Sequence, residues 1–430
     1  MKSTEVLELV VWGERVGALA ADPRLGCFVF AYDPAWKLTG IELAPLTMPL
    51  ADRRAVFAFP GLSEATFNRL PAMVADALPD DFGNALINAW MAERGVQRNE
   101  VTALDRLAYM GRRGLGAQEF RPARGAHRES SEPLAMQSLV EEARMLVSGS
   151  LHGDLEAQAA LANIIRVGTS AGGARAKAVI AWNPTTDEIR SGQFDAAPGF
   201  EHWLLKFDGV GRDTEPAMGS DYGRIEYAYH RMALAAQIEM MPCRLLEENG
   251  RAHFMTRRFD REVVDGKTVK HHVQTLCGMD QLDFRQRGTH SYSQLFLVMA
   301  RLGLGDGALE QAFRRMAFNA MARNCDDHTK NISFRLKQGG GWELAPAYDL
   351  THAYNPMGEW TFQHLMSVNG KFNAIAREDL LVEADRFGVG RARGVLAEVR
   401  AALGSWADFA GEAGLSRQPA DRVAKDFAPI

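Results

Sequence analysis

The stretch NCDDHTKN, residues 324–331, follows a segment with helical periodicity that ends near Arg323 and precedes the strand-like run ISFRLK. Within it, Asp326 and Asn331 stand five residues apart. A carboxylate can accept the proton of an attacking hydroxyl, and an amide oxygen can coordinate a hard cation without adding negative charge beside phosphates. Lys330, between them, could steady a phosphoryl group during transfer. The stretch therefore predicts phosphoryl transfer to a hydroxyl, with Asp326 as the base.

A further acidic residue, Asp349, completes the candidate centre. The runs ISFRLK and WELAP flank the turn QGGG, which predicts a hairpin that returns the chain to residues 324–331. Asp349, in the segment APAYDL, then stands where protein kinases place their magnesium aspartate, although its neighbours Tyr348 and Leu350 are not the Phe and Gly of the usual D-F-G. A literal D-F-G occurs at residues 81–83, but there it opens a predicted helix, where capping accounts for the acidic residues.

The region upstream predicts a nucleotide-binding lobe. Residues 167–177, VGTSAGGARAK, form a glycine-rich turn between strand-like runs. Glycines let backbone amides approach phosphate oxygens, and a serine hydroxyl can add a donor. The candidate phosphate contacts are Ser170, Gly172, Gly173 and Lys177. Such a turn alone is weak evidence, but the strand-like HWLLKFD then supplies Lys206, and a helix supplies Glu226 as its predicted ion-pair partner. This order of parts is that of a protein kinase.

Composition bounds the class of protein. The 430 residues are 47% hydrophobic and 24% charged, which is typical of a soluble globular chain of two or three units. A net charge of -5 predicts no direct, sequence-independent nucleic-acid binding by the whole chain. The four cysteines form no C-x-x-C pair, which argues against a zinc site and a disulfide framework. No run approaches the roughly 20 apolar residues that span a bilayer, so we expect a cytoplasmic protein without a membrane partner.

The pattern of elements predicts an α+β protein. Residues 5–32 indicate a β meander, and residues 80–94 indicate a helix whose apolar face is Phe82, Leu86, Ile87, Trp90 and Met91. We expect residues 1–150 to form an N-terminal β-rich domain with helices and a linker. Residues 151–258 would form a kinase N-lobe with the phosphate loop and Lys206. Residues 259–430 would form a helical C-lobe with the catalytic loop and Asp349. The predicted fold is thus two-lobed and protein-kinase-like, preceded by a small β-rich domain.

Several segments together resemble a known family. GTSAGGARAK, HWLLKFD, TRRFDR, NCDDHTKN and LAPAYDL are similar, in this order, to the successive signature segments of HipA-type toxin kinases over roughly residues 160 to 355. VVWGERVGAL, CFVFAYDPAW and the LPDDFGNAL segment resemble that family's leading domain. The resemblance therefore covers most of the chain. It departs at Arg175-Ala176, where the family often has Gln-Glu or Gln-Pro, which leaves the roles of Arg175 and Lys177 open.

The resemblance implies a serine/threonine-protein kinase of a type II toxin–antitoxin system that uses ATP and Mg²⁺. Asp326 would be the base, Asn331 and Asp349 the magnesium ligands, and Lys206 an ATP-phosphate contact. Backbone atoms near Met255 to Arg257 would hold the adenine. Ser170 would be autophosphorylated, and because a phosphoserine carries about -2 charge, it would repel nucleotide and switch the enzyme off.

The same resemblance implies partners. Family members pair with a small helix-turn-helix antitoxin, HipB-like, that binds operator DNA, so this chain would reach DNA only indirectly. Some inactivate an aminoacyl-tRNA synthetase, of which glutamyl-tRNA synthetase is the best-known case. These partners would be a protein substrate and an antitoxin, neither of which the sequence itself identifies.

Four other interpretations stay open. The chain could be a catalytically silent co-repressor with a kinase-like fold, or a small-molecule phosphotransferase that shares the catalytic loop. Asp327 and His328 could bind a metal in a hydrolase, although three adjacent side chains cannot easily point at one ion. Cys325 with His328 could form a thiol nucleophile, but no oxyanion-hole element accompanies it, so we expect a buried, inert cysteine.

Overall fold

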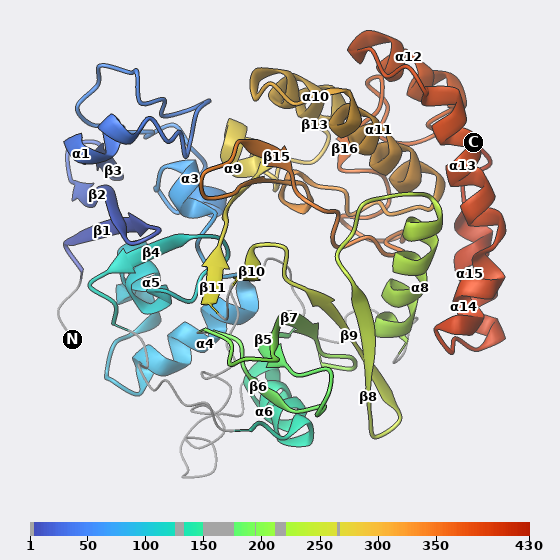
Figure 1. Ribbon diagram of the computed structural model, residues 1–430, viewed down its shortest axis with the longest axis horizontal. Helices are drawn as coiled ribbons and strands as arrows, with labels where there is room; N and C mark the ends of the chain where they lie inside the picture. The colour runs from blue at the N-terminus through green and yellow to red at the C-terminus, as the bar shows by residue number, and fades with distance from the viewer. Residues whose placement is uncertain (1–3, 125–132, 149–175, 194, 211–220, 265–266) are drawn as a thin grey trace.

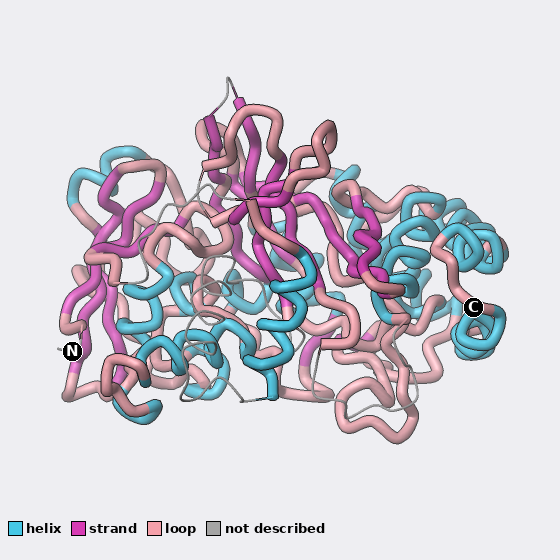
Figure 2. The backbone as a smooth tube through the Cα atoms, turned by 90° about the horizontal axis from the view of Figure 1, so that it is seen from below, coloured by secondary structure: helices cyan, strands magenta, loops and turns pink. Residues whose placement is uncertain are grey.

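The structure is a computed structural model that describes residues 4–124, 133–148, 176–193, 195–210, 221–264 and 267–430. It has a two-lobed, protein-kinase-like fold preceded by a small β-rich domain, with these parts packed side by side (Figure 1). Figure 2 shows the strands concentrated in the N-terminal domain and the N-lobe, whereas the C-terminal end of the molecule is built from helices. Within the described residues, no helix is long and apolar enough to cross a bilayer.

The N-terminal domain is built on a four-stranded antiparallel sheet with the order β3-β2-β1-β4. Its strands are β1 (Val6–Val11), β2 (Glu14–Asp22), β3 (Cys27–Tyr32) and β4 (Gln118–Arg121). The predicted meander is confirmed. Its helices are α1 (Pro34–Thr39), α2 (Glu64–Phe67), α3 (Ala72–Ala75), α4 (Asp81–Ala92) and α5 (Ala103–Met110), with a 3₁₀ turn at Arg98–Glu100. Helix α4 is also as predicted, because Asp80 caps it and the five predicted apolar residues are buried.

The N-lobe is a five-stranded antiparallel sheet with the order β6-β5-β7-β9-β8. The strands are β5 (Lys177–Trp182), β6 (Ile189–Ser191), β7 (Glu201–Lys206), β8 (Cys243–Glu248) and β9 (Arg251–Arg257). One apolar core joins this sheet to α6 (Met136–Ser148) and to α4 of the preceding domain. Helix α8 (Tyr222–Ala235) contributes instead to the core of the C-lobe. The N-lobe is therefore held between its neighbours on both sides.

The C-lobe is mostly helical, and its large core gathers α8 with helices from the rest of the chain. The helices are α9 (Leu276–Asp280), α10 (Tyr292–Arg301), α11 (Asp306–Met321), α12 (Arg377–Phe387), α13 (Ala392–Gly404), α14 (Trp406–Glu412) and α15 (Arg417–Asp426). The predicted hairpin is present as β14 (Ser333–Leu336) and β15 (Trp342–Leu344), which form a sheet with β12 (His272–Thr275). Short pairs complete the lobe: β10 (Arg261–Val264) with β11 (Lys267–Lys270), and β13 (His290–Ser291) with β16 (Met366–Ser367).

A buried ionic cluster ties the N-terminal domain to the junction of the two lobes. Asp260 is fully buried and accepts hydrogen bonds from Arg258 (2.9 and 2.7 Å), Arg261 (2.6 Å) and the backbone N–H of Gly116 (2.7 Å). Arg261 also donates to the carbonyl oxygens of Gly114 and Gly116, both at 2.9 Å. Burial alone would raise the pKa of Asp260, but the two arginines lower it well below its ordinary value.

We expect Asp260→Asn to lower the free energy of unfolding by about 3–5 kcal/mol, because it leaves two buried guanidinium groups without their counter-charge. Since the pKa of the folded-state carboxyl is depressed, this stabilisation is present at neutral pH and is lost as the pH falls. Urea unfolding of both proteins measures the difference. Asp421→Asn is the control, because Asp421 belongs to an exposed ion pair with Arg417, and no measurable change is expected. Equal effects of the two substitutions would contradict the prediction.

Candidate active site

Three charged side chains from three elements meet between the lobes. Lys206 ends strand β7, Glu226 lies in α8, and Asp349 follows β15. The Nζ atom of Lys206 lies 2.5 Å from Oε1 of Glu226 and also forms an ion pair with Oδ1 of Asp349. The Lys206 and Glu226 side chains are 13% and 4% exposed, so both charges are largely withdrawn from water. The predicted Lys206–Glu226 ion pair is present, and Asp349 is a second acid that pairs with Lys206.

The charges of this trio stabilise one another. Burial alone would lower the pKa of the Lys206 ammonium, but Asp349 and Glu226 together raise it above its ordinary value. Burial alone would raise the pKa of Asp349, but Lys206 and then Lys177 lower it below its ordinary value. Lysine and aspartate are therefore both fully charged at neutral pH. A buried ammonium with two carboxylates can attract a further cation to the acids and phosphate oxygens to the lysine.

The catalytic loop, residues 324–331, connects α11 to β14 and ends in a 3₁₀ turn at Thr329–Asn331. Asn331 donates from Nδ2 to the backbone carbonyl of Asp326 at 2.7 Å, which leaves Oδ1 as the amide atom suited to a cation. The Asp326 side chain is 48% exposed, and its Oδ1 lies 3.8 Å from Nε2 of His328. The carboxylate thus stands at the surface, where an approaching hydroxyl could reach it.

Asp327, next to Asp326, is buried and fully engaged inside the C-lobe. Its Oδ2 accepts from the hydroxyl of Tyr292 (2.8 Å) and pairs with Nδ1 of His364 (3.0 Å), while its Oδ1 accepts from the N–H of Leu365 (2.7 Å). Both carboxylate oxygens of Asp327 are therefore used in bonds that anchor the loop to the C-lobe. Across the described residues, no group of three or more His, Cys, Asp or Glu could hold a metal ion, so the hydrolase interpretation gains no support.

The segment that carries Asp349 is fastened to the catalytic loop. Cys325 donates its N–H to the carbonyl of Ala353 (3.0 Å), and Ala353 donates to Arg323 (3.2 Å). Asn324 donates from Nδ2 to the carbonyl of Asp349 at 3.4 Å. The backbone of Asp349 is left-handed, with φ 54°, a conformation that aspartate tolerates better than most residues. These bonds hold the backbone around Asp349 beside the first residues of the loop.

Tyr348, the residue before Asp349, makes polar bonds to the catalytic loop and to the strand that follows it. Its hydroxyl donates to the carbonyl of Lys330 (2.7 Å) and lies 2.5 Å from the hydroxyl of Ser333. Its ring stacks on Phe259 with centroids 5.6 Å apart. Tyr348 is therefore bonded to Lys330 and Ser333, which precede and follow Asn331 in the chain. Because Asp349 is the next residue, these bonds limit how far it can lie from Asn331, the other predicted magnesium ligand.

The donor set suits magnesium. Asn331 could offer the amide oxygen Oδ1, and Asp349 could offer Oδ2, since its Oδ1 contacts Lys206. Magnesium in proteins is commonly held by one or two such side chains together with water and substrate phosphates. Two oxygen donors beside a lysine therefore fit a cation that arrives with a nucleotide.

The structure describes some of the other predicted site residues and leaves others outside the described ranges. Lys177 begins β5 directly opposite Lys206, and its Nζ lies 3.6 Å from Oδ2 of Asp80. The Nζ atom of Lys330 lies 4.9 Å above the ring of Phe284. Ser170, Gly172, Gly173 and Arg175 lie outside the described residues.

The predicted adenine-binding stretch lies within the sheet. Met255 pairs with Leu205 of β7 on one side and with Arg244 of β8 on the other, and its side chain is buried. Its backbone groups therefore serve the strand ladder. Arg257, at the end of β9, donates its N–H to the carbonyl of Pro242 (2.9 Å) and its guanidinium lies 3.3 Å from Glu201. The stretch passes beside the strand that carries Lys206, and its role at the adenine stays a prediction.

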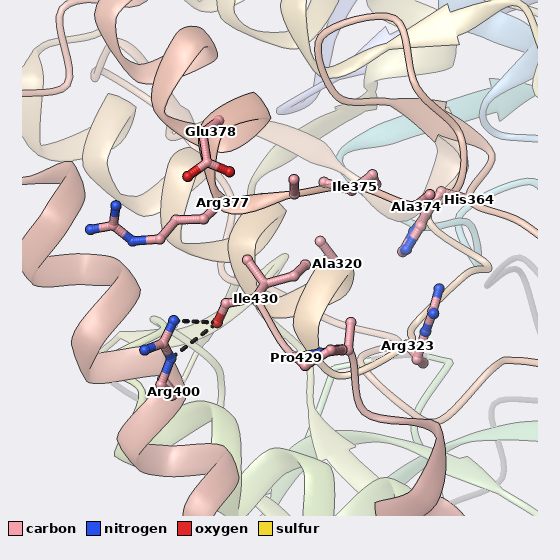
Figure 3. Close-up of a pocket in the computed structure, with 12 residues that line it drawn as sticks. Ala320, Arg323, His364, Ala374, Ile375, Arg377, Glu378, Arg400, Pro429 and Ile430 are labelled. Carbon is pink, nitrogen blue, oxygen red and sulfur yellow. Dashed lines mark hydrogen bonds between the residues drawn. The ribbon is translucent and has the colours of Figure 1, made fainter.

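Cys325 is buried, as expected for an inert cysteine, and its Sγ lies 3.8 Å from Nε2 of His364. A pocket of about 430 Å³ lies behind this part of the catalytic loop. Figure 3 shows His364 and Arg323 on one side of the pocket and Arg377 and Arg400 on the other, with Arg400 donating to the carbonyl of Ile430 at 3.0 and 2.6 Å. The residues that line this pocket do not include Asp326, Asn331 or Asp349, so it is separate from the candidate active site.

Some of these roles were not foreseen from the sequence. Asp327 and Asn324 were part of the quoted stretch, yet only the fold shows that they hold the loop together. The contact of Asp80 with Lys177 joins residues almost a hundred positions apart, and Asp80 was explained by helix capping alone. The polar residues crowded on both sides of Asp326 were the available signal for Asp327 and Asn324.

Comparisons with known proteins agree on one family. The model of the HipA-like C-terminal domain matches residues 169–428, and that of the HipA N-terminal domain matches residues 7–121. A comparison with curated proteins found no match. Among solved structures, the chain is similar to one in the Shewanella oneidensis MR-1 toxin–antitoxin complex of HipA, HipB and its operator DNA, with 19% identity, a TM-score of 0.66, and 97% of this chain and 94% of that chain covered.

A second solved structure is the Helicobacter pylori proinflammatory kinase CtkA, with 10% identity, a TM-score of 0.33, and 53% of this chain and 88% of that chain covered. This likeness is too low to carry an argument. The first structure supports the fold of the whole chain.

The His364–Asp327 pair predicts a pH dependence of stability. Burial alone would lower the pKa of His364, but the Asp327 carboxylate raises it from 6.5 to about 10. Because the pKa is raised on folding, the stabilisation is fully present below about pH 6.5 and is lost as the pH rises toward about 10. We expect His364→Gln to remove this part of the pH dependence. Urea unfolding across that range tests it, and an unchanged slope in His364→Gln would contradict it.

Proposed function

The chain belongs to the HipA family, and on that basis we propose that it is a protein serine/threonine kinase that transfers the γ-phosphate of ATP to a protein hydroxyl. The observation that carries the proposal is the contact of Lys206 with both Glu226 and Asp349, because the three groups come from the N-lobe sheet, a helix and the C-lobe. A kinase needs this lysine and this acid on opposite walls of one nucleotide site.

Each residue of the centre has a distinct task in this proposal. Asp326 accepts the proton of the substrate hydroxyl as that oxygen attacks the γ-phosphorus. Lys206, oriented by Glu226, binds ATP phosphate oxygens. Asn331 and Asp349 would hold magnesium, which when bound neutralises charge on the β- and γ-phosphates. Lys330, in the loop between Asp326 and Asn331, steadies the transferred group.

The ion pair between Lys206 and Asp349 fits a site waiting for nucleotide. In the structure each charge satisfies the other, so neither is left alone in a buried place. Phosphates can replace Asp349 as the partner of Lys206, and a magnesium ion can replace Lys206 as the partner of Asp349. When nucleotide and magnesium bind together, both Lys206 and Asp349 would keep a partner of opposite charge. When only one of them binds, either Lys206 or Asp349 would lose its partner.

We further propose inhibitory autophosphorylation at Ser170, by resemblance to the family. Ser170 lies outside the described residues, and Lys177 follows it at the start of β5. A phosphoserine with about -2 charge would compete with ATP phosphates for the positive field of Lys177 and Lys206. Such competition would give the enzyme an off state.

The proposed setting is a toxin–antitoxin system. The S. oneidensis HipA is described in complex with HipB and operator DNA, and we propose a HipB-like helix-turn-helix antitoxin as the partner of this chain, with DNA reached only through it. The proposed substrate is a protein serine or threonine, and an aminoacyl-tRNA synthetase such as glutamyl-tRNA synthetase is the first to test. A silent co-repressor or a small-molecule phosphotransferase is the alternative.

The test is incorporation of radiolabel from γ-labelled ATP with magnesium into the purified protein and into added synthetase. We expect Asp326→Asn to lower the rate about 10²-fold or more, because the attacking hydroxyl loses its base. Ser170→Ala should remove self-labelling while labelling of an added substrate continues. Lys206→Met should abolish ATP binding.

Asp385→Asn serves as the matched control, since Asp385 is an exposed acid on α12. Its rate should equal that of the wild type. ATP binding without any transfer would favour the co-repressor, whereas transfer only to small hydroxyl compounds would favour the phosphotransferase. Absence of both binding and transfer would refute the proposed function.

A further inference from the structure

Two acids of the N-terminal domain contact the two lobes of the kinase fold, and neither has been given a part in the proposed reaction. Asp76 and Asp80 flank the short segment Ala77-Leu78-Pro79, just before helix α4. The sequence singles out this region because it contains a D-F-G that is not the magnesium motif. In the structure the two acids contact different lobes of the kinase fold.

Asp80 contacts the N-lobe. Its Oδ1 accepts from the N–H of Gly83 at 2.7 Å and so caps α4, while its Oδ2 lies 3.6 Å from Nζ of Lys177. Capping therefore uses one oxygen, and the other faces the lysine. The side chains of Asp80 and Lys177 are only 2% and 3% exposed. A pair this deeply buried has strong mutual attraction, and the loss of one partner is costly.

The position of Lys177 explains why it needs an acid. Lys177 pairs directly with Lys206 across β5 and β7, so two cations stand opposite each other at the end of the sheet. Like charges in that arrangement repel. Glu226 and Asp349 contact Lys206, and Asp80 contacts Lys177. Asp80 thus supplies the charge that holds the second lysine at the edge where the phosphates of ATP would bind.

Asp76 contacts the C-lobe. It accepts hydrogen bonds from the N–H (2.8 Å) and the hydroxyl (2.8 and 3.0 Å) of Thr275, the N-cap of helix α9. The side chain lies so close to Gly278 that a Cβ there would stand 2.0 Å from Oδ2 of Asp76. Glycine at position 278 therefore makes room for this carboxylate.

Helix α9 and the residues after it connect Asp76 to the catalytic loop. Leu276 donates to the carbonyl of Ile332 (2.8 Å), and Thr329 donates its hydroxyl to the carbonyl of Leu282 (3.0 Å). Burial raises the pKa of the Asp76 carboxyl to about 6, and the positive charge of Lys330 opposes that rise. Asp76 is thus joined to the catalytic loop through α9.

We propose that Asp76 and Asp80 are positioning residues by which the N-terminal domain sets two parts of the active site, the catalytic loop through helix α9 and Lys177 at the start of β5. The inference rests on the proposed kinase function and deepens it. The acids are four residues apart, so their backbone can span at most about 14 Å. One short segment therefore limits how far the catalytic loop and Lys177 can separate, and the N-terminal domain forms part of the kinase site.

The two acids should give different kinetic effects. Asp80→Asn keeps the cap oxygen but removes the charge near Lys177, so we expect ATP to bind about tenfold more weakly or worse, with little change in kcat. Asp76→Asn keeps one acceptor oxygen for Thr275 but replaces the second by an amide nitrogen, which cannot accept, and so loosens the contact that holds α9 beside the loop. For it we expect kcat to fall about tenfold or more, while the affinity for ATP stays near that of the wild type.

The measurements are ATP titration by calorimetry, kcat and KM for ATP from radiolabel transfer, and hydrogen exchange of residues 324–331 without nucleotide. Exchange should rise in Asp76→Asn and stay unchanged in Asp80→Asn. Gly278→Ala should reproduce the Asp76→Asn pattern, because its Cβ displaces the carboxylate without removing it. Asp81→Asn is the matched control, since Asp81 is the exposed neighbour at the start of α4.

Asp80→Asn can be tested even if it is unstable. In the double variant with Lys177→Met, both members of the buried pair are changed together, and Asp80→Asn should weaken ATP binding no further than Lys177→Met alone. A further loss in that background would overturn the role of Asp80.

Three other results would overturn the inference. The first is that Asp76→Asn and Asp80→Asn both behave as Asp81→Asn does. The second is that they lower ATP affinity, kcat and melting temperature in parallel, as general destabilisation would. In either case the wild type still transfers phosphate, and the proposed function stands. The third is a wild type without ATP binding or transfer, which refutes both.

Discussion

The ammonium of Lys206 between the carboxylates of Glu226 and Asp349 is the interaction on which the rest of the structure depends. It joins a strand of the N-lobe, the helix α8 and the segment after β15, so it fixes two lobes at one point. A buried cation of this kind is stable only while its acids stay in place. The surrounding structure therefore has to hold three distant parts of the chain within hydrogen-bonding distance of one another. The bonds between the catalytic loop and the segment around Asp349 help to meet that requirement.

Buried polar bonds, more than apolar packing, give the catalytic loop its shape. Asp327 is hydrogen-bonded on both oxygens, and Tyr348 bonds to the backbone of Lys330 and to Ser333. Buried hydrogen bonds of this kind favour one arrangement, because any slip leaves a buried group without its bond. The outcome is a loop anchored in the interior of the C-lobe while the carboxylate of Asp326 stays half-exposed. This division suits the role of base that we propose for Asp326.

Local patterns predicted what depends on neighbouring residues. The cap and apolar face of α4, the β14–β15 hairpin and the Lys206–Glu226 pair all followed from periodicity, turn residues and the order of parts. The contacts that the sequence did not predict join residues far apart in the chain. Capping was a sufficient local explanation of Asp80, so nothing in its surroundings indicated a lysine far along the chain. The pairing of Met255 with strands on both sides is likewise visible only once the sheet is assembled.

The N-terminal domain contacts both lobes through separate surfaces. Helix α4 shares an apolar core with the N-lobe sheet, while α3 packs against α9 of the C-lobe. The buried cluster around Asp260 adds a third contact at the junction of the lobes. A rotation of one lobe against the other would disturb these contacts together, because a single small domain makes all of them. The fold therefore favours a single arrangement of the two lobes on either side of Lys206.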